Sequence, residues 1–137
     1  MKKILLLFSI ILLFNSCNLD DDNGNDNFHY VFLPVESVEI PSEFVLGETY
    51  EITIRYLRPT SCHAFDSFYY DKNLNVRTIA VQNIVFEQNN CEDLTNSIIE
   101  KTLDFYVTNN GSYIFKFWQG TNDDGEDVFL EYEIPVN

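Results

Sequence analysis

The residues best suited to chemistry are three cysteines and two histidines: Cys17, Cys62, Cys91, His29 and His63. Thiolates and imidazoles act as nucleophiles, general bases and metal ligands, and a thiol can also be oxidised to a disulfide or modified. Cys17 lies alone near the N-terminus, between an apolar run and a run of aspartates. Cys62 and Cys91 lie in the part of the chain whose pattern predicts a folded domain.

Cys62 and Cys91 make an even pair, which favours a disulfide in an exported protein. Closing a loop of about 30 residues would stabilise the fold by roughly 3 to 4 kcal/mol on the chain-entropy model. The alternative is a metal site that joins His63 to both sulfurs. Adjacent ligands on an extended chain point to opposite faces, and only a distant carboxylate offers a fourth ligand. The pattern favours the disulfide and predicts no metal centre.

Catalytic motifs are missing from the sequence. Neither a G-x-S-x-G nor an H-E-x-x-H motif occurs, and a cysteine–histidine hydrolase needs a free thiolate, which pairing removes. With 22 acidic residues, closeness of two carboxylates would say little about glycosidase chemistry. We expect no catalytic activity, no catalytic residues and no cofactor. The alternative is a small envelope hydrolase or carbohydrate-active enzyme whose site is not visible in sequence.

The densest acidic cluster of the predicted domain is Asp123-Asp124-Gly125-Glu126-Asp127. The sequence favours a hairpin turn in which Gly125 supplies a positive φ and the carboxylates stay solvated. The alternative is a weak calcium site, because hard cations take several carboxylate oxygens. We expect a turn without bound metal.

The clearest element is the hairpin formed by GSYIFKFWQG and EDVFLEYEIPV around this turn. Pairing Gly120 with Asp127 places Phe117 opposite Leu130 on an apolar inner face. A register slipped by one residue would set Lys116 against an inward apolar position, so the pattern supports this pairing. The same register predicts these further pairs: Phe115 with Tyr132, Tyr113 with Ile134, Lys116 with Glu131, and Trp118 with Phe129.

The pair Trp118 and Phe129 faces away from the core in this register. Two aromatic rings opposed on an outer face have little reason to stay in water. Either another segment covers them, or they form an exposed patch that binds a partner. They are the candidate binding residues of the sequence.

Alternation of apolar and polar residues predicts strands through most of the remaining chain, most clearly in ETYEITIRYLRP and TLDFYVT. Further strands are predicted at Tyr30–Ile40, Ala64–Tyr70 and Val76–Phe86, with a turn at Asp71-Lys72-Asn73 between the last two. CEDLTNSIIEKT is predicted to be a loop or a single helical turn that runs into a strand at Ile98.

About seven strands and no long helix predict an all-β, antiparallel two-sheet sandwich over residues 30–137. The chain end, NNGSYIFKFWQG…DVFLEYEIPV, resembles the last two strands of bacterial immunoglobulin-like domains. The chain is also similar to uncharacterised small lipoproteins of Bacteroidota that carry a cysteine pair in this arrangement. These resemblances imply an immunoglobulin-like sandwich and bring no assigned activity.

The N-terminus begins with Lys2 and Lys3 and an apolar run about half as long as a membrane-spanning helix needs. Ser16-Cys17 then resembles the lipobox of bacterial lipoproteins, which implies a signal peptide at 1–16 and lipidation of Cys17. The alternative is a secreted protein with an incidental or disulfide-bonded Cys17. Residues 17–29 predict a flexible acidic tether and resemble the acidic stretch of surface-exported lipoproteins of Bacteroidota.

The net charge of −14 becomes −16 when residues 1–16 are removed, since 6 basic residues then face 22 acidic ones. Such a domain repels phosphate backbones, which excludes nucleic acid, and it repels anionic headgroups, so only the lipid would hold it at a membrane. We expect an outer-membrane lipoprotein that faces the cell exterior and carries a binding or structural domain. Its expected partner is an envelope protein or an extracellular glycan. The alternative is an assembly factor that faces the periplasm.

Overall fold

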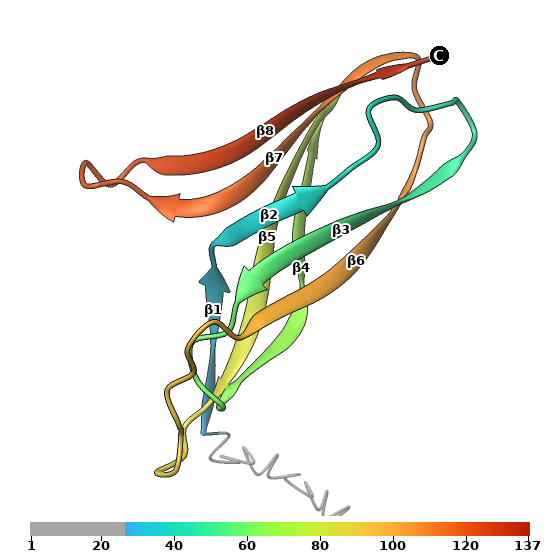
Figure 1. Cartoon of the computed structure of the whole chain (residues 1–137). Coiled ribbons are helices and arrows are strands. Elements are labelled where there is room, and N and C mark those ends of the chain that lie inside the picture. Colours follow the sequence, from blue (N-terminus) through green and yellow to red (C-terminus); the bar gives the residue numbers. More distant parts are fainter. Residues whose placement is uncertain (1–26) are drawn as a thin grey trace, which may run out of the picture.

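The computed structural model describes residues 27–137, which form eight strands in two sheets (Figure 1). The predicted signal peptide, Cys17 and the tether as far as residue 26 lie outside the described residues. The strands are β1 (Phe28–Leu33), β2 (Val35–Glu39), β3 (Thr49–Leu57), β4 (His63–Asn73), β5 (Val76–Phe86), β6 (Ile98–Tyr106), β7 (Gly111–Thr121) and β8 (Asp127–Val136). His29, which the sequence assigned to the tether, therefore lies in the first strand.

The two sheets have three and five strands. The three-stranded sheet has the order β2-β3-β6. In the five-stranded sheet, β4 follows one edge of β5, from Val76 to Val85. The other edge of β5 is shared, because β7 pairs with Val76–Ile79 and β1 with Val81–Phe86. β8 lies beside β7, and their hairpin extends beyond the other strands in Figure 1.

The predicted all-β fold with two sheets is confirmed, with eight strands in place of about seven. The predicted strand Tyr30–Ile40 is two strands, β1 and β2, and they lie in different sheets. Pro34 separates them, because its fixed φ and missing N–H end the pairing of β1. The chain crosses from one sheet to the other at this residue.

The prediction of purely antiparallel sheets is wrong for one pair, since β5 and β7 run parallel. Parallel neighbours need a long crossover connection, and here β6 in the opposite sheet supplies it. This pair departs from the antiparallel sheets of an immunoglobulin-like sandwich. A regular hairpin pattern in sequence does not reveal it, because the two strands are separated by a whole strand of the other layer.

The predicted register of the last hairpin is confirmed from Tyr113 to Trp118, including the pairs of Trp118 with Phe129 and Lys116 with Glu131. The predicted pair of Gly120 with Asp127 is wrong, because one extra residue of β7 shifts the register and Thr121 opposes Asp127. This β-bulge has Gly120 at φ +105°, a conformation that glycine adopts without strain.

The predicted strand Val76–Phe86 is confirmed as β5, and the predicted strand Ala64–Tyr70 is longer at both ends. The predicted turn at Asp71-Lys72-Asn73 is wrong, because these residues belong to β4. The turn lies at Leu74-Asn75. The segment before Ile98 is a loop. Within the described residues, no helix is long and apolar enough to cross a membrane.

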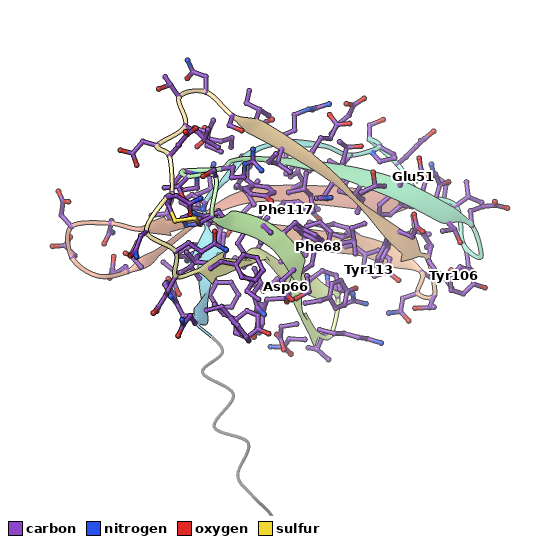
Figure 2. All side chains as sticks on the ribbon, turned by 90° about the horizontal axis from the view of Figure 1, so that it is seen from below. Glu51, Asp66, Phe68, Tyr106, Tyr113 and Phe117 are labelled. Carbon is purple, nitrogen blue, oxygen red and sulfur yellow. A yellow bond between two sulfur atoms is a disulfide. The ribbon has the colours of Figure 1, made fainter. Side chains whose placement is uncertain are left out.

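The core lies between the inner faces of the two sheets. The predicted alternation is confirmed, since Ile52, Ile54 and Tyr56 of β3 and Phe115 and Phe117 of β7 are fully buried. Figure 2 shows Phe117 among the packed side chains between the layers, whereas Glu51 points outward. Burial of each large side chain stabilises the fold by about 1.5 to 3 kcal/mol.

Candidate functional site

The outer face of the five-stranded sheet carries aromatic rings in a row across its strands. Tyr69 of β4 is paired with Ala80 of β5, and Trp118 of β7 is paired with Phe129 of β8. Phe117 pairs with Ile79, so Trp118 comes next to Ala80. The row therefore places an aromatic ring on each side of a central alanine.

Phe32, at the end of β1, joins the two sides of this row. Its ring centroid lies 6.0 Å from that of Tyr69 and 6.3 Å from that of Trp118, both in edge-to-face geometry. Phe32 and Tyr69 remain 46% and 48% exposed, and Trp118 and Phe129 are half-buried. Phe32 of β1 packs against Trp118, so a neighbouring strand covers part of this pair, and the half-buried Trp118 and Phe129 keep the rest of their surface in solvent.

The rings border a groove of about 350 Å³. Its floor is the central strand β5, where Thr78 and Ala80 have small side chains that leave space between the larger rings. This volume is near the lower end for small-molecule sites, which are concave and largely aromatic or apolar. We call this site the aromatic groove, and it is lined by Phe32, Tyr69, Thr78, Ala80, Trp118, Asp127 and Phe129.

A carboxylate is fixed beside the tryptophan. Trp118 Nε1 donates a hydrogen bond of 2.9 Å to Asp127 Oδ1. Asp127 takes this place because the bulge at Gly120 shifts the hairpin register and puts it opposite Thr121. The indole keeps one carboxylate oxygen occupied and leaves the side chain exposed, so the other oxygen can accept a hydrogen bond from a ligand.

A second polar group lies on β4, where a β-bulge places Asp66 between Phe65 and Ser67. Its Oδ2 accepts hydrogen bonds from Ser67 Oγ at 2.7 Å and from Gln82 Nε2 at 3.0 Å. Gln82 is paired with Phe32, so this cluster lies next to the aromatic groove on the same face. Figure 2 labels Asp66 on the five-stranded side of the molecule, away from Glu51.

The junction of β1 and β7 positions the groove. The two strands approach each other along the same edge of β5. The pairing of β1 ends with Leu33 opposite Val81, and the pairing of β7 ends with Phe117 opposite Ile79. Gln119 Nε2 donates a hydrogen bond of 3.0 Å to Val35 O, which ties the bulge of β7 to the start of β2. The groove thus depends on the point at which the chain changes sheets.

The aromatic surface continues along β1 and β5. Tyr30 is 55% exposed, Phe28 contacts it with ring centroids 5.7 Å apart, and Phe28 also contacts Phe86. Sequence reasoning missed Phe32 and Tyr69 as site residues. The signal was present in FHYVFL, where Phe28, Tyr30 and Phe32 recur every second residue on one face of a strand.

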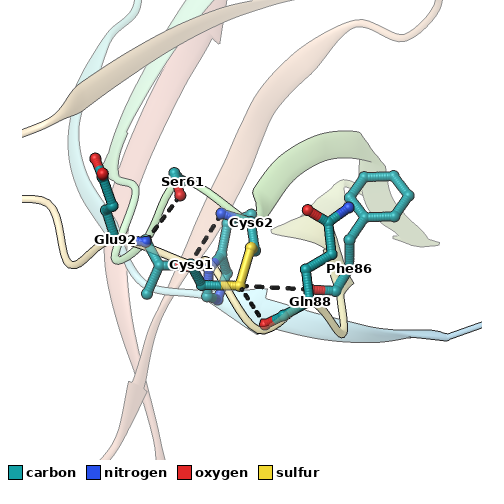
Figure 3. Close-up of a disulfide and its surroundings, with 8 residues drawn as sticks. Ser61, Cys62, Phe86, Gln88, Cys91 and Glu92 are labelled. Atoms are coloured by element: carbon teal, nitrogen blue, oxygen red, sulfur yellow. Dashed lines mark hydrogen bonds between the residues drawn. A yellow bond between two sulfur atoms is a disulfide. The ribbon is translucent and has the colours of Figure 1, made fainter.

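The disulfide between Cys62 and Cys91 is confirmed (Figure 3). Both sulfurs are consumed, so neither serves as a metal ligand or as a catalytic thiolate. Around it, Ser61 N donates to Glu92 O at 2.9 Å, and Glu92 N donates to Ser61 Oγ at 2.9 Å. The bridge and these bonds fix the loop after β5 to the start of β4, at one end of the domain.

The two histidines lie near this end and are brought closer together than their sequence positions suggest. His29 of β1 and His63 of β4 are both paired with Val85, from opposite edges of β5. His63 Nδ1 lies 2.8 Å from Thr60 Oγ1, and burial is the main cause that lowers the pKa of His63. His29 Nδ1 lies 3.2 Å from Glu87 Oε1.

The acidic turn closes around Asn122, whose Oδ1 accepts hydrogen bonds from Asp124 N and Glu126 N. Gly125 has φ +79°, as predicted. Within residues 27–137, no three histidine, cysteine or acidic side chains are grouped so that they could hold a metal ion.

Comparisons of the sequence with protein-family models, with curated proteins and with solved structures give no match. The described residues therefore define the class of protein by fold and site alone. It is a small, disulfide-linked, two-sheet β domain with an aromatic groove on the outer face of its larger sheet.

Proposed function

We propose that this protein is a lipid-anchored, outer-membrane domain that faces the cell exterior and binds an extracellular glycan in the aromatic groove. The aromatic groove carries the proposal. Aromatic faces are electron-rich and pack against C–H groups, while a sugar ring offers such C–H groups on its faces and hydroxyl donors at its edge. Asp127 supplies a fixed acceptor for a hydroxyl beside the Trp118 ring.

The shape of the site favours a ring-sized ligand over a protein partner. A stable protein interface buries at least about 1,000 Å² and presents a continuous apolar centre. Here small residues on β5 interrupt the aromatic rings, and the resulting groove of about 350 Å³ would leave a flat protein surface poorly packed. An envelope protein thus fits this face less well than a glycan.

The polar groups favour binding over hydrolysis. Asp66 and Asp127 are both solvent-exposed, and each accepts hydrogen bonds from a neighbouring side chain. Glycoside hydrolysis uses two carboxyl groups that flank the scissile bond, whereas Asp127 is the one carboxylate among the residues that line the aromatic groove. The proposed protein is therefore a glycan-binding module without catalytic activity.

The immunoglobulin-like kinship remains part of the proposal and rests on Tyr113. Its hydroxyl accepts hydrogen bonds from Asn109 N at 2.9 Å and Thr108 N at 3.2 Å, across the corner between β6 and β7. A tyrosine near the start of a strand that bonds to the backbone a few residues upstream is a feature of such sandwiches. Tyr113→Phe should lower the denaturation midpoint in urea more than Tyr132→Phe does. An equal effect would remove this support.

The binding proposal is tested by native electrophoresis through gels that contain single neutral polysaccharides. We expect at least one polysaccharide to retard the protein and Trp118→Ala to abolish the retardation. Tyr106→Ala is the matched control, because Tyr106 is 57% exposed on the outer face of the other sheet. Equal retardation of the Trp118→Ala variant would place binding elsewhere, and release of reducing ends from the polysaccharide would favour the hydrolase.

Anchoring is tested separately at Cys17. Labelled palmitate should enter the parent protein and not the Cys17→Ser variant, which should leave the membrane fraction. Protease added to intact cells should digest the parent protein if it faces the exterior. Palmitate that still enters the variant would contradict lipidation at Cys17.

A further inference from the structure

Carboxylates surround the aromatic groove on its own face of the sheet. Register turns Asp71, Asp127, Glu131 and Glu133 outward from β4 and β8, and Asp66 in the bulge of β4 lies on the same face, where it accepts a hydrogen bond from Gln82. Lys116 is the basic residue that register turns outward from the five strands, because Arg77 is buried in the core and Lys72 pairs with it on the other face. The face around the groove is therefore strongly negative.

The charge of Lys116 is already neutralised. Its Nζ lies 3.3 Å from Glu131 Oε1 and 4.7 Å from the centroid of the Phe129 ring. A ligand anion at the groove would have to displace one of these contacts to reach the ammonium group. It would also approach Asp127 Oδ2, which can only accept a hydrogen bond.

We infer that the aromatic groove selects uncharged sugars, and that Asp127 determines this specificity by rejecting sugars that carry carboxylate, sulfate or phosphate. This inference rests on the proposed glycan binding. A hydroxyl donates to Asp127 and satisfies it, whereas an anionic substituent leaves two like charges close together with no donor between them. Two like charges within contact distance of each other repel measurably even near a solvated surface.

A small organic cation would also meet aromatic rings and a carboxylate here. Ammonium sites hold one charge over the faces of several rings, however, and in this groove Phe32 meets both Tyr69 and Trp118 edge-to-face. The groove is also open to solvent rather than enclosed, which suits a chain of sugar rings better than a single point charge.

The test measures the dissociation constants of the purified full chain for a neutral polysaccharide, a polyuronate and a sulfated polysaccharide at low and high salt. We expect the neutral polymer to bind at least about ten-fold more tightly at low salt. Added salt should narrow this ratio, because screening weakens the repulsion of the anionic polymers. Acidic polymers that bind as well as the neutral one at low salt would overturn the inference.

Asp127→Asn isolates the charge, because its amide oxygen can still accept from Trp118. We expect this variant to lower the ratio of acidic to neutral dissociation constants by about two- to five-fold. Asp104→Asn, on the outer face of the three-stranded sheet, is the matched control and should leave the ratio unchanged.

The outcomes separate the two claims. If Trp118→Ala abolishes neutral binding while Asp127→Asn leaves the ratio as it was, the specificity inference fails and the glycan-binding proposal stands. If no polysaccharide binds at any salt concentration, both fail. If choline alone binds and Trp118→Ala abolishes that binding, the groove is a cation site and both fail.

Discussion

The outer faces of the two sheets differ in a way that core formation does not explain. On the three-stranded sheet, Arg55 of β3 bonds to Glu39 of β2 at 3.1 Å and to Glu100 of β6 at 2.8 Å. On the five-stranded sheet, rings from four strands occupy the corresponding outer positions. An antiparallel sheet with one solvated face commonly carries polar residues there, and the larger sheet departs from this rule by presenting a group of rings beside its outward carboxylates.

The depressions on the two outer faces also differ in the residues that line them. Each measures about 350 Å³, but the one on the smaller sheet has no aromatic ring in its lining, which consists of Glu39, Ile40, Pro41, Glu51 and Thr53. Sheet proteins avoid exposed aromatic surface because it promotes association. The rings of the larger sheet gather around its depression, and this is the face that we propose for binding.

The largest expected effect is a loss of folding stability, which should be greater for a residue on the inner face of β7 than for its neighbour on the outer face. Phe117→Ala should destabilise the fold by about 3 to 5 kcal/mol, because Phe117 is fully buried and its removal leaves a cavity. Trp118→Ala, one residue along, should cost about 1 to 2 kcal/mol, because Trp118 is half-buried and has one hydrogen bond. Urea denaturation measures both, and equal losses would mean that Trp118 is a core residue.

The next effect concerns the disulfide, which lies away from the groove. Replacing Cys62 and Cys91 together by Ala should cost about 3 kcal/mol and lower the melting temperature by several degrees. The emission of Trp118 in the folded state should not change, because the bridge joins the other end of β5. Two titratable thiols in the denatured, unreduced parent protein would contradict the bridge.

The smallest effect is a pH dependence confined to the five-stranded sheet, which holds both histidines of the described chain. Burial lowers the pKa of His63 below its ordinary value of 6.5. Below that pH the unfolded chain binds a proton that the folded protein does not, so stability should fall from pH 7 to pH 5. His63→Gln should flatten this part of the profile. An unchanged slope in His63→Gln would assign the dependence to other groups.

The sequence allowed correct prediction of the features that depend on near neighbours. The pair of Trp118 with Phe129 follows from one hairpin and its alternation. The disulfide follows from the two cysteines that remain once Cys17 is assigned to the predicted lipobox. Phe32 and Tyr69 could not be placed beside Trp118, because that requires knowing that β1 and β7 share one edge of β5. No local pattern encodes this arrangement. The bulge at Gly120, which brings Asp127 to the indole, was missed for the same reason.

Trp118 is the single tryptophan of the chain, so its fluorescence reports on the aromatic groove without labelling. The most direct test of the account titrates the purified protein with a neutral polysaccharide that retards it in gels and follows this emission. We expect a saturable shift to shorter wavelength and protection from acrylamide quenching, with Phe32→Ala weakening both and Tyr106→Ala changing neither. Saturable binding that leaves the emission and quenching of Trp118 unchanged would contradict the assignment of the groove as the glycan site.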